Sequence, residues 1–416
     1  TAPGYLSDLF SAFYPLAAAS PAITDLRLEE HGLVWRHAPA VLGHPLPDGS
    51  WALLHRDRQV TARLLDEASP GDGEAWLALC DLWDRIGEQV LHAVLTPFPP
   101  VRAGLGALVR LPRVGGLSFV KTMLTPAADL ARQRFGGVAP RMLLAGNAGH
   151  ADIPLDAPGS GLMAVLLAML GQTVGFPAPE GGAGRLAEAL ARRARSRGVE
   201  IRTSAEVTRI EVSGGRAAAV VTADGERVPV ARAVVADVVA TRLYGGLVRE
   251  EDLPARLRKE MSAFQLDPAT VKVDWALSGP VPWREQPSYA PGTFHVADSV
   301  EEMTEANAQI SAGAVPARPF LLAGQMTTTD PTRSPAGTES VWAYTHVPHE
   351  VRRDAGEGGV RGVWDHDDLE RFADRMQDRL ERLAPGFGAR VLARRVLGPR
   401  ELEARAADLV GGAIGG

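Results

Sequence analysis

A glycine-rich turn at residues 182–187 has the spacing of a phosphate-binding loop. Gly182-x-Gly184-x-x-Ala187 fits the relaxed dinucleotide pattern G-x-G-x-x-A and opens a predicted helix, 186–197. In a true fingerprint the turn follows a strand, and an acidic residue about 20 positions on holds the ribose. Here prolines precede the turn, and the later position is Arg202. We therefore favour a close helix–backbone contact, or a helix start facing a cofactor. A similar pattern, Gly159 to Ala164, follows a loop and is disfavoured.

Histidine and cysteine chemistry is weakly indicated. His346 and His349 would share one face of a helix, but strand residues precede them and Pro348 separates them, so a metal site is disfavoured. His366 lies among aspartates at a helix start, where acids complement the helix dipole, and is interpreted as part of a capping cluster. Cys80 lies beside leucines in a helical pattern and is interpreted as a core residue. No metal site is predicted.

Composition narrows the class of protein. The chain has 416 residues, a net charge of -6 and one cysteine, which argues against nucleic-acid binding, an internal disulfide or a zinc site built from several cysteines. Three of its 44 basic residues are lysines, a bias typical of GC-rich bacterial genes. No apolar run is long enough to span a bilayer, and a cytoplasmic location is expected. Both ends have the character of interior loops, so we expect a fragment of a longer chain.

The elements that must position these residues are mixed. A hairpin is predicted from strands at 33–37 and 51–55, followed by a mostly helical block at 73–172. After the helix at 186–197 we predict a strand at 199–202, a hairpin from 206–212 and 217–223, and a short buried strand at 233–236. Further strands are predicted at 271–277, 320–326, 341–346 and 389–396, and an amphipathic helix is predicted at 365–384. Together these elements give a mixed α/β architecture.

One segment is conspicuously one-sided in charge. Residues 89–128 contain no Asp or Glu between Gln89 and Ala128, while Arg102, Arg110, Arg113 and Lys121 are spread among apolar residues. An ordinary buried helical layer is the simpler interpretation. The functional alternative is a surface that touches lipid headgroups, or that rims the entrance for a lipid-like substrate. Peripheral membrane contact through 89–128 is therefore a hypothesis.

The stretches 176–186, 199–210, 215–217 and 231–236 resemble the middle of the flavin amine oxidase-like superfamily, in its phytoene desaturase-related branch. Residues 11–21, 384–387 and 411–412 resemble one subgroup of that branch. The resemblance covers nearly the whole chain. It implies a partial FAD-binding, Rossmann-like domain together with a substrate domain of mixed sheet and helices. The family's N-terminal G-x-G-x-x-G segment and C-terminal FAD segment are not found in this sequence.

The resemblance also implies a division of the chain and a set of cofactor contacts. Residues 1–172 and 241–400 would form the substrate domain, 173–240 the middle FAD segment, and 401–416 a return toward the FAD domain. The backbone at Val207 would meet the adenine, Gly181 and Gly182 would open the helix beside the cofactor, and Gly411 and Gly412 would lie toward the flavin.

The implied activity is hydride transfer from an apolar substrate, polyene or lipid-like, to the flavin of FAD. The cofactor carries the difficult step and the protein supplies position and a dry surrounding, so no catalytic side chain is named. The alternative is a non-catalytic scaffold or partner-binding protein that has lost FAD. Because the fingerprint is missing, we expect this chain by itself to bind FAD poorly.

Overall fold

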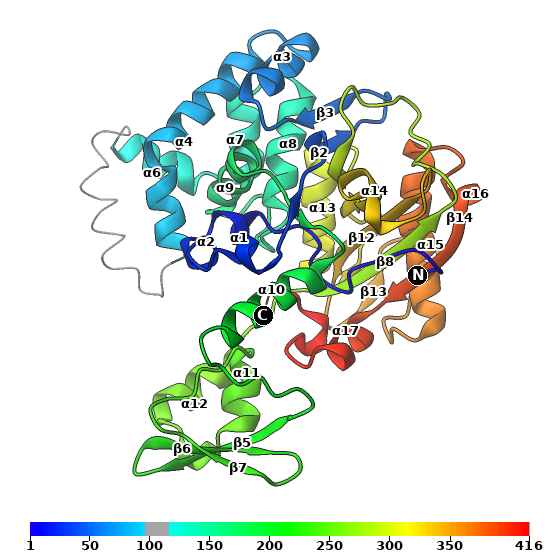
Figure 1. Ribbon diagram of the computed structural model, residues 1–416. Coiled ribbons are helices and arrows are strands. Elements are labelled where there is room, and N and C mark those ends of the chain that lie inside the picture. The colour runs from blue at the N-terminus through cyan, green and yellow to red at the C-terminus, as the bar shows by residue number, and fades with distance from the viewer. Residues whose placement is uncertain (96–115, 416) are drawn as a thin grey trace. The chain divides into compact units, whose positions relative to one another are not determined.

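The computed structural model describes residues 1–95 and 116–415, which divide into two compact units (Figure 1). Unit 1 comprises residues 1–193 and 271–396, and unit 2 comprises 194–270 and 397–416. The boundaries predicted at 172/173, 240/241 and 400/401 separate substrate-domain segments from FAD-domain segments, and they stay predictions.

Unit 1 is built on a seven-stranded mixed sheet, counted over the described residues, with the order β14-β8-β12-β11-β9-β2-β3. β11 pairs antiparallel with both β12 and β9, whereas β2 pairs parallel with β9. The strands are β2 (Ala40–Pro45), β3 (Trp51–Leu54), β8 (Ala269–Leu277), β9 (Pro291–Val296), β11 (Leu321–Gln325), β12 (Glu339–Val347) and β14 (Val391–Leu397). The residues of β2, β8, β9 and β11 are buried on both faces of the sheet, including Lys272 and Asp274 of β8.

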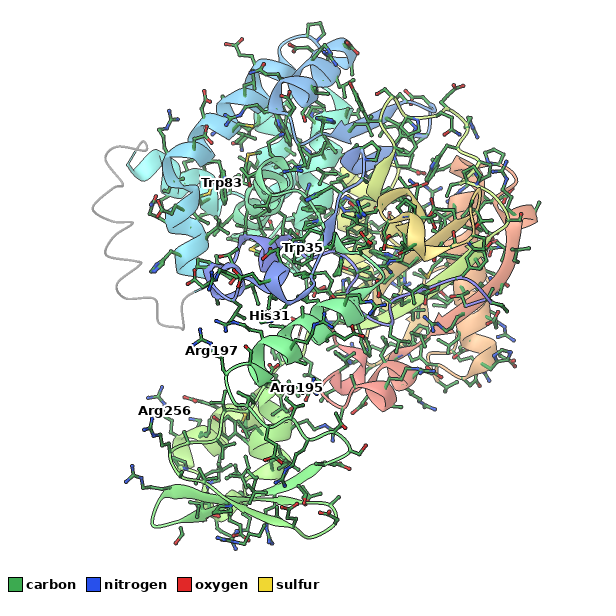
Figure 2. All side chains as sticks on the ribbon, in the orientation of Figure 1. His31, Trp35, Trp83, Arg195, Arg197 and Arg256 are labelled. Carbon is green, nitrogen blue, oxygen red and sulfur yellow. The ribbon has the colours of Figure 1, made fainter. Side chains whose placement is uncertain are left out.

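A helical block covers one face of this sheet and forms the largest core cluster of the described residues. Its members are α3 (Arg58–Ala68), α4 (Asp72–Val94), α6 (Leu117–Leu124), α7 (Ala127–Arg134), α8 (Val138–Ala148) and α9 (Ser160–Thr173). α8 and α9 pack against β2 and β3. Cys80 lies in this core and burial raises the pKa of its thiol to about 11, as expected for a core residue rather than a nucleophile. Trp83 lies in α4, as Cys80 does, and is labelled in Figure 2.

Shorter elements and one long helix complete unit 1. In α15 (His366–Leu383) the N-cap Asp365 accepts a hydrogen bond from the Asp368 amide, which confirms the predicted capping cluster. The Trp275 indole of β8 donates to Gln377 of α15 (2.9 Å), so α15 packs near the β8 end of the sheet. The remaining elements are α1 (Pro15–Ala19), α2 (Pro21–Thr24), β1 (Trp35–Arg36), β4 (Ala178–Pro179), α13 (Val300–Ser311), β10 (Ala314–Val315), α14 (Met326–Thr329), β13 (Arg353–Asp354) and α16 (Phe387–Arg390).

The helix that follows the glycine turn is α10 (Ala183–Arg195), close to its predicted bounds. Leu186 and Ala189 on its buried stripe pack against Leu28 and Leu33, with Trp35 (labelled in Figure 2) at the margin of the cluster. Gly198 follows with a φ of +81°, a conformation that suits glycine and ends the helix as predicted.

Unit 2 contains a small antiparallel sheet of β5 (Val207–Ser213), β6 (Arg216–Thr222) and β7 (Arg227–Pro229) in that order. The predicted hairpin at 206–223 is therefore confirmed. The rest of the unit includes α11 (Ala240–Arg242), α12 (Ala255–Ser262) and α17 (Pro399–Arg405), and an isolated bridge joins Ala269 to Ala413.

Three expectations about strands are wrong. β2 rather than 33–37 pairs with β3, because a close turn favours the adjacent segment 40–45; β1 pairs with β4 instead. Residues 199–202 and 233–236 are not strands, and Val235 is 95% exposed rather than buried. Apolar runs form strands only where another strand satisfies their backbone groups, and here no described strand pairs with them. Arg102, Arg110 and Arg113 of the one-sided segment lie outside the described residues, and Lys121 is exposed on α6.

Candidate functional site

The first residue of α10 and the glycine turn before it are held by carboxylates of the chain itself. The amide of Gly181 donates to Asp330 Oδ2, and the amide of Ala183 donates to Asp8 Oδ1, each at 2.8 Å. Gly181 and Gly182 both have positive φ, and a Cβ on Gly182 would lie 3.1 Å from Leu6 and 3.2 Å from Asp8. The close approach that these glycines permit is therefore to residues 6–8.

Arg333 joins the two carboxylates. Its guanidinium, fully buried, lies 2.8 Å from both Asp8 Oδ2 and Asp330 Oδ2 and also donates to the Pro179 carbonyl. Burial by itself raises the pKa of Asp330, but hydrogen bonds from Gly181, Thr332 and Arg333 outweigh it and lower that pKa. We call Asp8, Asp330 and Arg333 the α10 cap cluster.

A second buried charge adjoins this cluster. Lys272 of β8 donates to the Asp8 carbonyl and to Asp274, which also pairs with Arg395. Burial lowers the pKa of Lys272, because the charged ammonium loses its hydration. An amine with a perturbed pKa is a candidate functional group, although structural ion-pair networks produce such shifts too. The sequence reasoning did not single it out.

The α10 cap cluster decides whether a dinucleotide pyrophosphate fits at this turn. A helix N-terminus binds a phosphate through free amides and the positive end of the helix dipole. Here those amides are donated to carboxylates, whose negative charge repels a second anion. The pyrophosphate of FAD therefore does not fit at Gly181 and Gly182 as the structure has them, and no reaction step is derived through it.

The other predicted cofactor contacts lie in unit 2. Val207 is half-buried at the start of β5, and β5 is an edge strand of the three-stranded sheet. Gly411 donates its amide to Glu403, and a Cβ on Gly412 would overlap the backbone of Pro399. The backbone of Val207, on an edge strand, suits the expected adenine contact. Close packing against Pro399 within unit 2 explains why position 412 is a glycine. Their roles toward a cofactor stay predictions.

A row of partly buried aromatic residues lies on β12, a strand with neighbours on both sides. Val341, Ala343, Thr345 and Val347 are buried, while the alternate residues Trp342, Tyr344 and His346 are only half-buried. Trp342 stacks on Tyr344 (ring centroids 5.9 Å, interplanar angle 13°), and Phe13 lies 6.2 Å from Trp342. Gly324 of β11 leaves space for the Trp342 and Phe13 rings. We call Trp342, Tyr344 and His346 the β12 row.

Histidines from three further segments lie on the same face. Leu322 of β11 is opposite both Tyr344 and His295, and cross-strand partners share a face. His295 Nε2 is 2.8 Å from His150 Nε2, and His44 Nε2 is 2.8 Å from the Ala297 carbonyl. Asp152, which follows α8, has an Oδ1 2.9 Å from His346 Nε2.

Burial controls the protonation of these groups. It lowers the pKa of His44 and of His150 to about 4, and lowers that of His295 well below its ordinary value. The charge of a protonated His346 adds to the effect on His150, and those of His150 and His44 add to the effect on His295. Burial and the Asp152 carboxylate raise the pKa of Tyr344. At neutral pH the imidazoles of His44, His150 and His295 and the phenol of Tyr344 are therefore neutral.

The sequence reasoning missed this histidine group. It considered His346 only as a partner of His349, and it passed over His44, His150 and His295. No short spacing unites them, since β2, β9, β12 and the residues after α8 are far apart in the chain. The available signal was a histidine within each of two apolar strand runs, 40–45 and 291–296.

Gly146 of α8 provides a test of how tightly this face is packed. A Cβ on Gly146 would overlap Nδ1 of the buried His295 ring. We expect Gly146→Ala to lower the free energy of unfolding by about 1–3 kcal/mol, because an overpacked core must shift. Gly184→Ala is the matched control, since its Cβ would meet nothing within 4 Å inside α10. Chemical denaturation of both variants measures the difference; equal stability of the two would contradict the packing argument.

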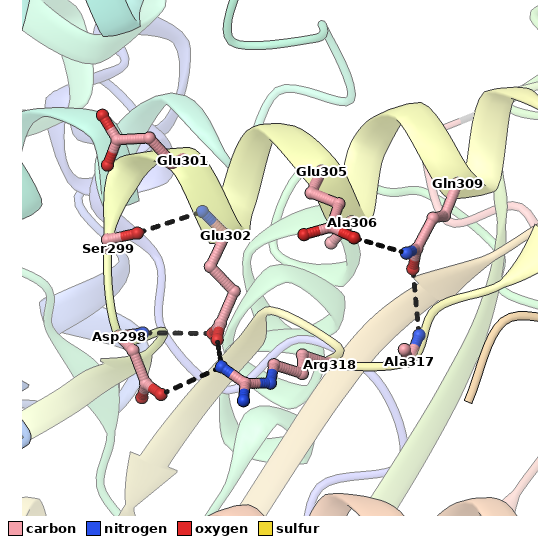
Figure 3. A pocket seen from close by; sticks show the side chains of 9 residues that line it. All are labelled: Asp298, Ser299, Glu301, Glu302, Glu305, Ala306, Gln309, Ala317 and Arg318. Atoms are coloured by element: carbon pink, nitrogen blue, oxygen red, sulfur yellow. Dashed lines mark hydrogen bonds and ion pairs between the residues drawn. The ribbon is translucent and has the colours of Figure 1, made fainter. Parts of the chain in front are cut away.

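A pocket of about 350 Å³ lies beside the start of α13 (Figure 3). Its carboxylates are compensated within the chain: Glu302 pairs with Arg379 and Arg318, Glu301 pairs with Arg132, and Glu305 accepts from Gln309. The Ser299 hydroxyl caps the helix by accepting from the Glu302 amide. The pocket therefore carries the chemistry of a helix start.

Metal sites and membrane-spanning helices are both absent from the part of the chain that the structure describes. No group of three or more His, Cys, Asp or Glu side chains there is arranged to hold a metal ion. No helix in that part of the chain has the length and apolar character needed to cross a membrane.

Comparisons with known proteins agree with this architecture. Residues 125–328 match the family of flavin-containing amine oxidoreductases. The chain is 27% identical, over 97% of its length and 75% of the relative's, to pyridine nucleotide-disulfide oxidoreductase domain-containing protein 2 of Mus musculus. It is 29% identical over 196 residues, 47% of this chain and 37% of the other, to a 4,4'-diapolycopene oxygenase of Methylomonas.

A solved oxidoreductase from Methanosarcina mazei shares the fold. Its TM-score is 0.52 at 13% identity, over 91% of this chain and 73% of that one. The predicted mixed α/β fold is thereby confirmed. Residues 125–328 thus match the flavin amine oxidase family of FAD-dependent oxidoreductases, and the chain is homologous over nearly its whole length to pyridine nucleotide-disulfide oxidoreductase domain-containing protein 2.

Proposed function

We propose that this chain supplies the substrate-binding face of an FAD-dependent oxidoreductase that oxidises an apolar small molecule, polyene or lipid-like. The β12 row carries the proposal, because a central strand with partly buried aromatic residues at alternate positions offers apolar area that the fold itself does not fully cover. When bound, the flavin accepts a hydride from the substrate. The chain's own residues would orient the substrate along Trp342 and Tyr344 and exclude water.

The cofactor contacts of this proposal are the edge backbone of β5 at Val207, for the adenine, and Gly411 and Gly412, toward the flavin. Edge strands offer backbone donors and acceptors that any ligand of suitable shape can meet. Since the amides of Gly181 and Ala183 are engaged, any pyrophosphate contact lies elsewhere than at the first turn of α10. Peripheral membrane contact through 89–128 is part of the same hypothesis, as the route for a lipid-like substrate.

The proposal is tested by binding of a neutral apolar dye, N-phenyl-1-naphthylamine, whose fluorescence rises in apolar surroundings. We expect Trp342→Ala to weaken dye binding by about tenfold, as the loss of an aromatic contact predicts. Trp51→Ala, remote from the β12 row, is the control. If both variants bind the dye as the unaltered chain does, the β12 row is not the binding face.

A second candidate function is a non-catalytic scaffold that does not hold FAD, and the α10 cap cluster favours it. Flavin binding tests the scaffold. We expect the 416-residue chain to retain far less than one FAD per chain after gel filtration, measured by absorbance near 450 nm. The double variant Asp8→Asn with Asp330→Asn should not restore FAD retention if the pyrophosphate is held elsewhere. Near-stoichiometric yellow protein would contradict the scaffold and would reopen Gly182 to Ala187 as a phosphate turn.

A further inference from the structure

The β12 row is apolar along most of its length and polar at one end. Trp342 and Tyr344 present ring faces, whereas His346 lies beside Asp152. The side chains of His346 and Asp152 are each 11% exposed, so bulk water reaches them poorly. This end of the row is the feature from which the inference is drawn.

Hydrogen-bonding capacity at this end is unused. Within the described part of the chain neither ring nitrogen of His346 makes a hydrogen bond of good geometry, and neither does Asp152 Oδ1, although Nε2 and Oδ1 are 2.9 Å apart. Buried polar atoms nearly always make hydrogen bonds in folded proteins, so three atoms without a well-formed hydrogen bond at one place require an explanation. Asp152 also has a φ of +53°, a strained backbone conformation for a residue other than glycine. Such strain persists where the surrounding structure holds it, and it gathers at binding sites.

The groups around this end restrict which ligand could satisfy it. His150 is neutral there, and Tyr344 remains protonated. A carboxylate head group would be repelled by Asp152. An ammonium group would have to lose its hydration among the aromatic rings and imidazoles, which is costly for an ion. A hydroxyl is uncharged, and it both donates and accepts, as a carboxylate and an imidazole together require.

We propose that His346 and Asp152 bind the hydroxyl group of an otherwise apolar ligand whose carbon chain lies along Trp342 and Tyr344. This inference rests on the proposed function and narrows its substrate class from apolar molecules in general to apolar alcohols. His346 and Asp152 are then specificity residues: they select the ligand by its oxygen, while the rest of the row binds its carbon chain.

Competition against N-phenyl-1-naphthylamine tests the proposal without any cofactor. The competitors are dodecane, 1-dodecanol, dodecylamine and dodecanoate, which share a chain length and differ in head group. We expect 1-dodecanol to compete about tenfold better than dodecane, the preference that one or two additional hydrogen bonds would give. The charged competitors should fall below 1-dodecanol.

Two variants keep the test falsifiable. His346→Phe retains a ring of similar size, and Asp152→Asn retains a residue that tolerates the positive φ. Each should bring 1-dodecanol down to the level of dodecane and leave dodecane binding unchanged; thermal melts confirm that both variants are folded. His366→Phe on the exposed start of α15 is the control.

The outcomes separate this inference from the proposed function. Equal competition by dodecane and 1-dodecanol in the unaltered chain, or an alcohol preference that survives both variants, overturns the hydroxyl site and leaves the apolar face standing. Strongest competition by dodecylamine overturns it in favour of an ammonium site. Failure of every competitor to displace the dye overturns the inference and the apolar face together.

Discussion

Replacing Arg333 by methionine should lower the free energy of unfolding by about 3–5 kcal/mol, because it leaves buried carboxylates without their counter-charge. Asp330 and Arg333 are fully buried and Asp8 nearly so, and the guanidinium bonds to both acids. Methionine fills much of the same volume, so the loss is chiefly electrostatic. Urea denaturation followed by circular dichroism measures it.

The controls use the same substitution at a solvated pair. Arg27 and Glu30 form an ion pair with side chains 68% and 56% exposed, so Arg27→Met should change the stability by no more than about 0.5 kcal/mol. The double variant Asp330→Asn with Arg333→Met removes one of the two stranded charges and should recover part of the loss. A cost below about 1 kcal/mol for Arg333→Met would show that the α10 cap cluster is not buried as described.

Acidification should destabilise the chain steeply between about pH 6.5 and pH 4. His44 and His150 have a pKa of about 4 in the folded chain against 6.5 for an ordinary histidine, and His295 is lowered further. In that window the unfolded chain binds more protons than the folded chain, so the free energy of unfolding falls as the pH falls. Above pH 6.5 all three are neutral in both states and contribute no slope.

The expected loss at pH 4 is on the order of 3 kcal/mol for His44 alone. Charged neighbours modify this loss. Glu302 stabilises the protonated form of His44 and Arg379 destabilises it. Asp152 stabilises the protonated form of His150 and His346 destabilises it. His44→Gln keeps a donor toward the Ala297 carbonyl and removes the titration, so its pH profile should be flatter than that of the unaltered chain. His366→Gln, on an exposed histidine, should leave the profile unchanged. Identical profiles for all three proteins would contradict a buried neutral His44.

Local patterns in the sequence were sufficient for many regular elements, but not for β2 and β9. The 3.6-residue spacing of Leu369, Phe372, Met376 and Leu380 predicted α15, and the segment 271–277, with Val271, Val273 and Trp275 at alternate positions, predicted β8. Ser213 to Gly215 predicted the turn between β5 and β6. Each of these signals is carried by residues within one turn of helix or a few positions of strand. The family resemblance of 176–236 was likewise contained in continuous stretches.

Pairing of distant segments was decided only by the tertiary structure. The segments 199–202 and 233–236 have the composition of strands, but a strand requires a partner for its amides and carbonyls, and composition does not supply one. The turn at Gly181 and Gly182 has the spacing of a phosphate loop, yet carboxylates at positions 8 and 330 occupy its amides. Neither aspartate is near the turn in the sequence.

The candidate site follows the same rule. The sequence shows a histidine at position 346 but not its neighbours. The association of His346 with Asp152, Tyr344, His150 and His295 depends on β12, β11 and β9 being adjacent and on α8 ending beside them. The amino-acid sequence by itself indicated the helical block, α10, α15, about half of the strands and the family resemblance, because these depend on local periodicity and continuous motifs. The β12 row with its polar end and the α10 cap cluster were decided by the tertiary structure, because burial and charge pairing arise only where segments remote in the chain meet.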